Sequence, residues 1–396
     1  MGLQDTPRAD RLHIGLFGKR NAGKSSLVNA LTNQKISLVS DVAGTTTDPV
    51  YKSMEIHGIG PCVFIDTAGF DDTGALGAQR VGQTQKAMEK TDVAVMLFAQ
   101  EPDDEEKKWL SLLKKQNTPV IPVINKADIL AGIGVLSEKV AAVCQKEPVV
   151  VSAVTGQGID KLRRALVEAV PDEYAQLTIT GNLIGEDDLV LLVMPQDIQA
   201  PKGRLILPQV QTLRELLDKK CLVMSVTDDK LPQALKSLSS PPKLIITDSQ
   251  VFKAVYEQKP PESRLTSFST LFAQYKGDID YFVKSTQALE LLDEDGRVLI
   301  AEACTHVPLK EDIGRDKIPK LLRKRYGERL TIDHVNGADF PRDLSGYDLV
   351  IHCGACMFNR KYVLSRVAQA KEQRVPMTNY GVVLAYLSGI LDKIDY

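Results

Sequence analysis

Short hydrophobic runs recur along the first 171 residues and alternate with stretches that carry apolar residues at helical spacing. The stretch from Lys24 to Leu31 is typical of the latter, because its apolar positions recur every three or four residues. Strands that alternate with helices in this way form βαβ units, whose strands are parallel. A mostly parallel sheet is therefore predicted, with strands in the runs His13–Phe17, Cys62–Ile65, Val93–Phe98, Val120–Ile124 and Val149–Val151.

Two further units with the same rhythm follow in the rest of the chain. Their strand-like runs are 189–194, 222–226, 244–247, 298–303, 330–334 and 348–352. A helical stretch is expected at 270–292, and further helical patterns separate the runs. We therefore expect an α/β fold throughout, with domains at 1–172, 182–262 and 265–396.

Composition and charge restrict the class of protein. Hydrophobic residues make up 43% and charged residues 25%, as in an ordinary soluble globular protein, and no apolar run reaches membrane-spanning length. The formal net charge of -2 provides no global basic field for nucleic acid or anionic lipid. The N-terminus lacks a secretion pattern, so we expect a cytoplasmic protein with six reduced cysteines. One basic cluster, Lys317–Arg325, is predicted to be a solvated helix face, with a nucleic-acid patch as the alternative.

One strand end carries a phosphate-binding pattern. The segment from Gly18 to Ser25 fits G-x-x-x-x-G-K-[ST], follows an apolar strand and opens a helix. Consecutive backbone N–H groups at a helix N-terminus bind phosphates, and glycines keep Cβ atoms out of the way. In such a loop Lys24 reaches the β and γ phosphates, and the Ser25 hydroxyl coordinates magnesium. Taken alone, the pattern could also be explained by a Gly-rich turn between a strand and a helix that binds no phosphate.

Three more segments at strand ends complete a predicted nucleotide site. Asp66–Gly69 ends an apolar strand, where a carboxylate holds a magnesium-bound water and a glycine N–H senses a γ-phosphate. Asn125–Asp128 and Ser152–Ala153 each follow another strand. Because ligands gather at the carboxyl ends of strands in α/β sheets, all four segments are predicted to converge on one ligand.

This ordered set of motifs resembles the Ras-like GTPases. The resemblance implies that the Asp128 carboxylate pairs with the guanine edge and that the backbone of Ser152–Ala153 contacts the guanine oxygen, so it implies GTP rather than ATP. A carboxylate that accepts two N–H bonds from guanine would be left unsatisfied by adenine. We therefore expect a P-loop GTPase domain with a parallel-rich sheet, followed by the two smaller α/β domains.

Three features bear on how fast GTP is hydrolysed. The segment 44–48 looks like the first switch of the TrmE-Era branch, in which a threonine closes on magnesium, and we favour Thr46, with Thr45 second. Phe70 stands where Ras-like proteins have a water-orienting glutamine, so unaided hydrolysis is expected to be slow. In the TrmE branch the residue at the Asn21 position resembles part of a potassium site, and that ion supplies the charge that an arginine finger supplies elsewhere.

The predicted residues of this site fall into three overlapping groups. Those expected to act in hydrolysis are Asn21, Lys24, Thr46, Asp66 and Gly69, and no general base is assigned. Magnesium is expected on Ser25, Thr46 and Asp66, and potassium on Asn21. The predicted nucleotide-binding residues are Gly18, Asn21, Ala22, Gly23, Lys24, Ser25, Ser26, Thr45, Thr46, Asp66, Gly69, Asn125, Lys126, Asp128, Ser152 and Ala153.

The last domain carries a second candidate site, made of cysteines and histidines. Cys304 and His306 follow one strand-like run, while His352, Cys353 and Cys356 follow another. A C-x-x-C turn sets two thiolates within reach of one metal, and a third thiolate from another segment closes three corners. Spacing alone leaves three interpretations open: a structural zinc of Cys₃His type, an iron-sulfur cluster with one non-cysteine corner, or reduced cysteines without metal.

The pattern C-x-H followed after 45 residues by H-C-x-x-C, behind a Ras-like GTPase domain, resembles the HydF family, the GTPase maturation factors of FeFe-hydrogenase. The resemblance implies that Cys304, Cys353 and Cys356 ligate a 4Fe-4S cluster whose fourth iron keeps an exchangeable ligand. It leaves His306 and His352 as candidate fourth or accessory ligands.

The same resemblance implies a function and partners. Ala200–Gln209 is similar to the opening of that family's dimerisation domain. A potassium-stimulated GTPase, expected as a homodimer, would receive the diiron precursor of the hydrogenase active site and transfer it to the apo FeFe-hydrogenase. Two radical-SAM maturases build that precursor, so they and the hydrogenase are the expected partners, with no membrane and no nucleic acid. Two alternatives stay open: a TrmE-Era-type RNA-modification or ribosome-assembly GTPase with a structural zinc, and a redox-sensing thiol module.

Overall fold

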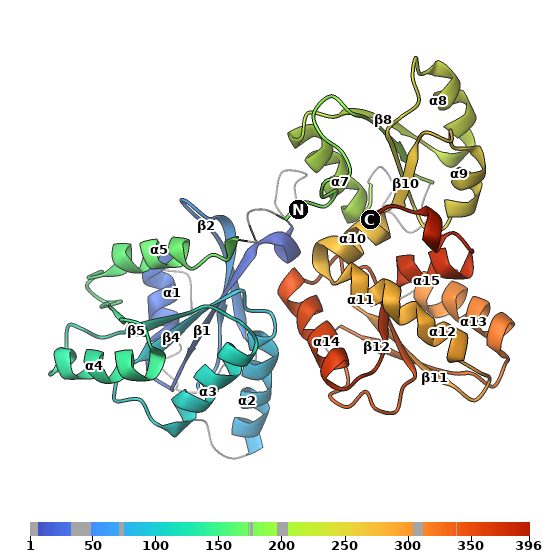
Figure 1. The fold of residues 1–396 in the computed structure, drawn as a ribbon. Helices are drawn as coiled ribbons and strands as arrows, with labels where there is room; N and C mark the ends of the chain where they lie inside the picture. Colours follow the sequence, from blue (N-terminus) through green and yellow to red (C-terminus); the bar gives the residue numbers. More distant parts are fainter. Residues whose placement is uncertain are drawn as a thin grey trace. The chain divides into compact units, whose positions relative to one another are not determined.

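The structure is a computed structural model that describes residues 7–32, 49–70, 75–172, 174, 177–195, 205–303, 312–337 and 339–396. The chain divides into two compact units, Met1–Gln176 and Leu177–Tyr396, and each is described by itself. Figure 1 gives the order of the elements along the chain. Both units are built of helices and strands, as the sequence predicts.

The first unit contains one six-stranded sheet, in the order β2-β3-β1-β4-β5-β6. Every neighbouring pair is parallel except β2 with β3, which is antiparallel. The strands are β1 (Leu12–Gly18), β2 (Val50–Ile56), β3 (Gly60–Asp66), β4 (Val93–Phe98), β5 (Val120–Ile124) and β6 (Val149–Val150). The predicted parallel-rich sheet is thus confirmed.

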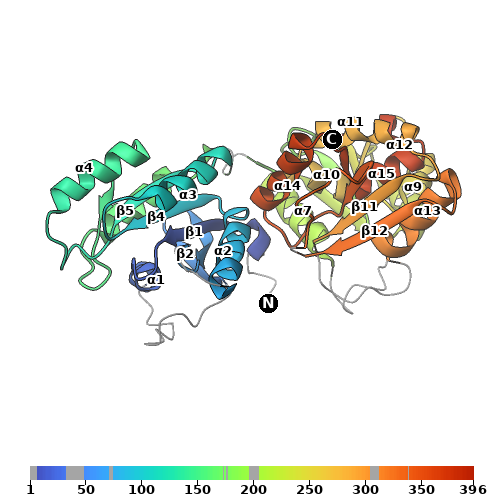
Figure 2. The same cartoon turned by 90° about the horizontal axis from the view of Figure 1, so that it is seen from below.

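Helices cover both faces of this sheet because its central strands are apolar on both sides. In β1, Leu12 and Leu16 face one core, while Phe17 faces the other. Helix α1 lies on one side of the sheet and α3 and α4 on the other (Figure 2). The helices are η1 (Arg8–Asp10), α1 (Lys24–Thr32), α2 (Ala75–Met88), α3 (Asp104–Lys115), α4 (Ile133–Cys144) and α5 (Ile159–Glu168).

The second unit contains two four-stranded sheets, in which every pair of neighbouring strands is parallel. The first has the order β10-β9-β7-β8 and the second the order β12-β11-β13-β14. The strands are β7 (Leu189–Val193), β8 (Leu222–Val226), β9 (Leu244–Thr247), β10 (Arg264–Ser267), β11 (Arg297–Glu302), β12 (Thr331–Asn336), β13 (Leu349–His352) and β14 (Met377–Asn379).

The helices of the second unit follow the predicted rhythm but are shorter than predicted in one place. The expected helix at 270–292 is interrupted, since α10 ends at Lys276, Gly277 follows, and Asp278 caps the next helix by accepting from the Tyr281 N–H. The helices are α7 (Leu207–Asp218), η2 (Asp228–Lys230), α8 (Leu231–Ser237), α9 (Phe252–Gln258), α10 (Phe268–Lys276), α11 (Ile279–Lys284), η3 (Ser285–Gln287), α12 (Ala288–Leu291), η4 (Ile313–Lys317), α13 (Ile318–Tyr326), α14 (Arg360–Glu372), α15 (Tyr380–Leu387) and η5 (Leu391–Lys393).

The two sheets of the second unit share helix α10. Its residues Leu271 and Phe272 pack in the core of the first sheet, whereas Ala273 packs in the core of the second. The C-terminal residues return to the first sheet, where Arg264 of β10 pairs with Asp395 at 2.7 Å. Strand β10 therefore belongs to the sheet of the second predicted domain, although the sequence boundary after residue 262 leaves it outside that domain.

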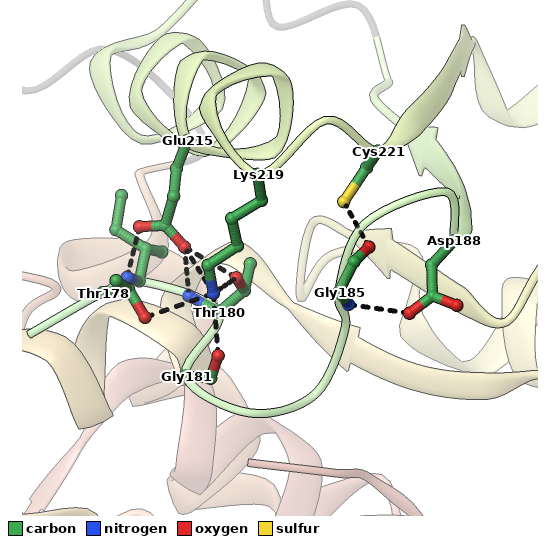
Figure 3. A network of polar contacts seen from close by, with 9 residues as sticks. Thr178, Thr180, Gly181, Gly185, Asp188, Glu215, Lys219 and Cys221 are labelled. Carbon is green, nitrogen blue, oxygen red and sulfur yellow. Dashed lines mark hydrogen bonds and ion pairs between the residues drawn. The ribbon is translucent and has the colours of Figure 1, made fainter.

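The segment that opens the second unit is joined by hydrogen bonds to an ion pair at the end of helix α7 (Figure 3). Lys219 lies 3.5 Å from Glu215 and donates to Thr180 Oγ1 at 2.9 Å and to the Gly181 carbonyl at 2.7 Å. The Glu215 carboxylate also accepts from the Thr180 N–H at 2.8 Å. The backbone groups of this segment, which belong to no strand or helix, thus find partners on α7.

No helix among the residues described above is both long enough and apolar enough to cross a membrane. The longest helix of either unit is α2, with 14 residues.

Candidate functional site

The P-loop joins β1 to α1, and its shape requires the residue types found there. A Cβ on Gly18, whose φ is +152°, would lie 2.7 Å from the Leu97 carbonyl oxygen. A Cβ on Gly23, whose φ is +90°, would lie 2.2 Å from Asn125 Nδ2. Asn21 has a φ of 60°, in the left-handed region that asparagine tolerates better than most residues. The two glycines allow the loop to lie tightly against the neighbouring strand ends.

Lys24 folds back over this loop. Its Nζ donates to the carbonyl oxygens of Gly18 at 2.8 Å and Lys19 at 2.9 Å, and the residue is buried. These contacts hold the ammonium group beside the backbone N–H groups that bind phosphate in such loops. Ser25 and Ser26, which follow on α1, are exposed.

The predicted magnesium ligands Ser25 and Asp66 lie together. The Asp66 carboxylate, at the end of β3, is hydrogen-bonded to Ser25. Burial raises the pKa of Asp66, and the opposing effects of the Ser25 hydrogen bond and of the charges of Lys24 and Lys52 are smaller. A magnesium ion there would add positive charge and favour the carboxylate form. The third predicted ligand, Thr46, lies with Thr45 outside the described residues.

The residue after Gly69 points into the protein core. Phe70 is buried, and its ring stacks on Trp109 with the centroids 5.5 Å apart. Phe17 of β1 lies on the same tryptophan, at 6.3 Å. An apolar ring packed in this way provides no group to orient a water molecule at a γ-phosphate. The sequence shows that a phenylalanine stands where Ras-like proteins have a glutamine. It does not predict that Phe70 packs against α3.

The two segments that follow β5 and β6 are tied to the P-loop and to each other. Asn125 donates from Nδ2 to the Ala22 carbonyl at 3.0 Å, and its Oδ1 accepts from the Ala153 N–H at 3.2 Å. The buried Ser152 hydroxyl donates to Asp128 at 2.6 Å. The Asp128 side chain is otherwise exposed, so its carboxylate is oriented and open to a ligand. Together with the hydrogen bond between Asp66 and Ser25, these contacts link all four predicted segments.

Two lysines complete the geometry around the P-loop. Lys126, between Asn125 and Asp128, is half-buried and has a φ of 64°. Lys19 lies 2.6 Å from Asp103 and 3.4 Å from Glu106, at the start of α3. This link from the P-loop to α3 was not predicted from the sequence. The sequence feature that could have indicated this link is the run of acidic residues that opens α3. Acidic residues are also favoured at a helix N-terminus, so the run does not by itself indicate a partner.

The second candidate site begins where β13 ends. The Cys353 sulfur accepts hydrogen bonds from the backbone N–H groups of Ala303, at 3.0 Å, and Ala355, at 3.4 Å. Ala355 has a φ of 50°, which turns the chain back between Cys353 and Cys356. In the metal-free protein, burial raises the pKa of the Cys353 thiol to about 11, although these two hydrogen bonds lower it. Both sequence-predicted cysteines of the turn therefore lie at the carboxyl end of the second sheet.

These observations fit the thiolate corner of an iron-sulfur cluster. Backbone N–H groups directed at a sulfur are among the features that set the potential of such clusters. Ala303, which donates one of them, directly precedes Cys304 in the chain. Cys304 and His306 themselves lie outside the described residues, and within the described ranges no group of three metal-binding side chains occurs. The structure therefore places two of the three predicted cysteine ligands.

His352 has both ring nitrogens in contact with the protein. Nδ1 lies 2.8 Å from the Cys353 carbonyl, to which it must donate, and Nε2 lies 2.9 Å from Nη1 of Arg366. Burial and the charge of Arg366 lower the pKa of His352 to about 3, so the ring is neutral at physiological pH. In this arrangement neither nitrogen is available to a metal. The sequence could not identify Arg366, because it lies fourteen positions away on another element.

The other described cysteines belong to other parts of the fold. Cys62 and Cys221 are buried and Cys144 is half-buried, as expected for core residues. Burial raises the pKa of Cys62 to about 12 and that of Cys144 to about 11. These three thiols are thus protonated and unreactive at neutral pH.

Three family models match the chain in order along the sequence. Residues 13–126 match the 50S ribosome-binding GTPase family, residues 179–277 match the hydrogen maturase F dimerization domain, and residues 280–394 match the hydrogen maturase F tetramerization domain. The two hydrogen maturase F models together span just over half of the chain. Their junction falls next to Gly277 and Asp278, where α10 ends and α11 begins.

Curated relatives match about two fifths of the chain. GTPase Der of Wolinella succinogenes is 40% identical over 180 residues, which cover 42% of this chain and 37% of that protein. The tRNA modification GTPase MnmE of Endomicrobium trichonymphae is 37% identical over 165 residues, which cover 40% of this chain and 35% of that protein. The chain thus spans little more than a third of the length of these relatives. Among solved structures, Era in complex with MgGDPNP and ribosomal RNA matches 57% of this chain and 97% of its own, with 20% identity and a TM-score of 0.37.

Proposed function

Because the chain belongs to the hydrogen maturase F family and is a GTPase, we propose that it carries the diiron precursor of the FeFe-hydrogenase active site and transfers it to the apo-hydrogenase. The carrier site would be a 4Fe-4S cluster on Cys304, Cys353 and Cys356, with one iron left for an exchangeable ligand. Two radical-SAM maturases would supply the precursor, and the chain would act as a homodimer or a larger oligomer, which the names of the two matched family domains support.

One observation carries this proposal. A GTPase domain is followed, in a single chain, by the two hydrogen maturase F domains, and the second of these contains the cysteine turn after β13. The Cys353 sulfur already accepts two backbone N–H groups, which suits a metal-bound thiolate better than a buried neutral thiol. A cluster with three protein ligands can bind a further group at its fourth iron. The diiron precursor would bind to the protein there.

The GTP site would act as the switch. The P-loop N–H groups and Lys24 would bind the phosphates, Ser25 and Asp66 would hold magnesium, and Asp128 would select guanine. Loss of the γ-phosphate would release the loop at Gly69, as in other GTPases. Because Phe70 is buried in the core and provides no polar group, we further propose that potassium at Asn21 supplies the missing positive charge.

The carrier proposal is tested on anaerobically reconstituted full-length protein. Iron, sulfide and zinc are measured per chain, together with the electron paramagnetic resonance spectrum after reduction, for the wild type and for Cys353→Ser. About four irons with matching sulfide in the wild type, lost in the variant, are expected. Cys62→Ser is the matched control, since Cys62 is buried in the other unit. One tightly bound zinc without iron would contradict the carrier role.

The potassium proposal has its own test. GTP turnover is compared at equal concentrations of potassium and sodium chloride, for the wild type and for Asn21→Ser. Faster turnover in potassium is expected in the wild type alone. Equal rates in both salts for the wild type would contradict the proposal.

The alternative of an RNA-linked GTPase with a structural zinc has weaker support. Its sequence features are the TrmE-Era resemblance of the first domain and the basic cluster at 317–325, which falls on η4 and α13. Arg325 lies over the rings of Tyr326 and Tyr386, and Lys320 pairs with Asp316 at 2.7 Å. Several of these cations are thus engaged locally rather than arranged as one open stripe, which favours a solvated helix face.

A further inference from the structure

A buried arginine lies directly behind the cysteine turn. Arg366, on α14, is 2% exposed, and its guanidinium is surrounded by the rings of Phe340, Phe358 and Tyr362, each centred 4.7 Å away. Its Nη1 donates to His352 at 2.9 Å, and Nη2 donates to the Gly337 carbonyl. Among the described residues, its hydrogen-bond and ring contacts are thus with neutral groups and aromatic faces.

Such a charge is costly unless an anion balances it. Burying a guanidinium without a carboxylate costs several kcal/mol, so buried arginines are normally found in ion pairs. No carboxylate within the described ranges pairs with Arg366, and its Nε is buried without a hydrogen-bond partner. Cation-π contacts recover only part of this cost. A negative charge close to Arg366 would therefore offset the cost of burying its guanidinium.

The arginine is connected to the cysteine turn through one hydrogen-bonded chain. Arg366 donates to His352 Nε2, and His352 Nδ1 donates to the carbonyl of Cys353 at 2.8 Å. The same carbonyl accepts from Asn379 at 3.3 Å. The backbone carbonyl of Cys353 is thereby held by two side chains, while its sulfur is held by two backbone N–H groups.

A second buried cation supports the other end of the turn. Lys276, the last residue of α10, is 1% exposed and donates to the carbonyl of Phe358 at 2.9 Å and to that of Ala355 at 3.4 Å. Since α10 is shared by the cores of both sheets, this contact is anchored on a rigid element. Two cations from different helices thus converge on the segment 353–358.

We propose that Arg366, assisted by Lys276, is a positioning residue of the cluster site: it fixes the turn through His352 and balances the negative charge of the thiolates and the cluster that they hold. This inference rests on the proposed function and goes beyond it, because neither residue belongs to the cysteine motif. Three thiolates and their cluster carry net negative charge, which grows by one when the cluster is reduced. Nearby buried cations therefore stabilise the reduced state and hold the cluster more firmly.

The experiment compares reconstituted full-length wild type with Arg366→Met, Arg366→Lys and Lys371→Met. Lys371 is the matched control, since it lies on the same helix, half-exposed and paired with Asp278. The readouts are iron per chain, the midpoint potential from a redox titration followed by electron paramagnetic resonance, and the rate of iron loss to a chelator. Circular dichroism and GTP turnover report folding.

Arg366→Met is expected to shift the midpoint to a more negative potential and to lose iron roughly 10- to 100-fold faster, as for other residues that orient metal ligands. Arg366→Lys should recover part of both effects, and Lys371→Met should match the wild type. A loaded Arg366→Met with the wild-type midpoint and rate would overturn the inference. If that variant does not fold, Arg366→Lys and Lys276→Met carry the test, and wild-type behaviour in both overturns it. A wild type without iron overturns the proposed function, and this inference with it.

Discussion

The nucleotide site and the cysteine site occupy equivalent places in their sheets but are supported in different ways. Each lies at loops that follow parallel strands, after β1, β3, β5 and β6 in one case and after β13 in the other. The nucleotide loops are held by hydrogen bonds to one another. For example, the Asn125 side chain donates to the Ala22 carbonyl and accepts from the Ala153 N–H. The cysteine turn is instead held by side chains from α10 and α14.

This difference suits the ligands that we propose for the two sites, GTP for the first and an iron-sulfur cluster for the second. A nucleotide brings many polar atoms of its own, so a loop of N–H groups with one lysine is sufficient. A cluster offers mainly sulfur and negative charge, so its turn requires rigid support and buried positive charge in the protein. The contrast suggests four changes that should affect one site and leave the other intact.

Lys24→Ala should have the largest effect. Its ammonium is the only described side-chain cation that reaches across the P-loop carbonyls, and charge stabilisation of transferring phosphates is worth about 3 to 4 kcal/mol. We expect GTP turnover to fall roughly 100- to 1000-fold, as measured by phosphate release. Iron loading should not change. A loss of iron in this variant would show that the two sites are not built independently.

Arg366→Met should destabilise the second unit of the cluster-loaded protein by about 1 to 3 kcal/mol. The substitution removes the hydrogen bond to buried His352 and leaves that ring nitrogen without a partner. Thermal unfolding followed by circular dichroism measures the effect, with Lys371→Met as the control at less than about 0.5 kcal/mol. GDP affinity should be unchanged. Equal melting temperatures for the two variants would contradict a supporting role of the buried arginine.

Asp128→Asn should weaken guanine-nucleotide binding by about 2 to 3 kcal/mol, or roughly 30- to 150-fold in Kd. The carboxylate, oriented by Ser152 at 2.6 Å, is the group expected to accept from guanine, and an amide accepts with one oxygen only. Isothermal titration with GDP measures the change. Asp160→Asn serves as the control, because that carboxylate pairs with Arg163 on the surface of α5. Matching affinities in both variants would exclude Asp128 as the selecting residue.

Lys19→Ala should have the smallest effect. The Asp103 side chain is 50% exposed, so water screens the pair and its loss costs at most about 1 kcal/mol. We expect a slightly lower melting temperature of the first unit and GDP affinity within about threefold of the wild type. Tenfold weaker binding would indicate that α3 controls the shape of the P-loop.

Much of the fold and of the nucleotide site was predictable from the sequence, since the signals are local. Apolar runs predicted where the strands lie. Gly18, Lys24 and Asp128 occupy fixed positions in short motifs. The positions of Thr45, Thr46, Cys304 and His306 remain predictions, because they lie outside the described residues.

The supporting residues were not predictable, because their partners are distant in the chain. Lys276 reaches a carbonyl 82 positions away, and no pattern in the sequence links the two. An isolated arginine on an amphipathic helix gives no signal that it will be enclosed by aromatic rings, which depends on how α14 packs on the sheet. The predicted helical stretch at 270–292 did not include the break at Gly277, where α10 ends.

The position of Trp109 has a practical consequence. It is the protein's sole tryptophan, buried on α3 with its ring against Phe70, the residue that follows Gly69. Indole fluorescence depends on the packing around the ring, so the unmodified protein carries an intrinsic optical reporter beside the end of the segment Asp66–Gly69. Binding and turnover of GTP can then be followed by emission alone, without any added dye.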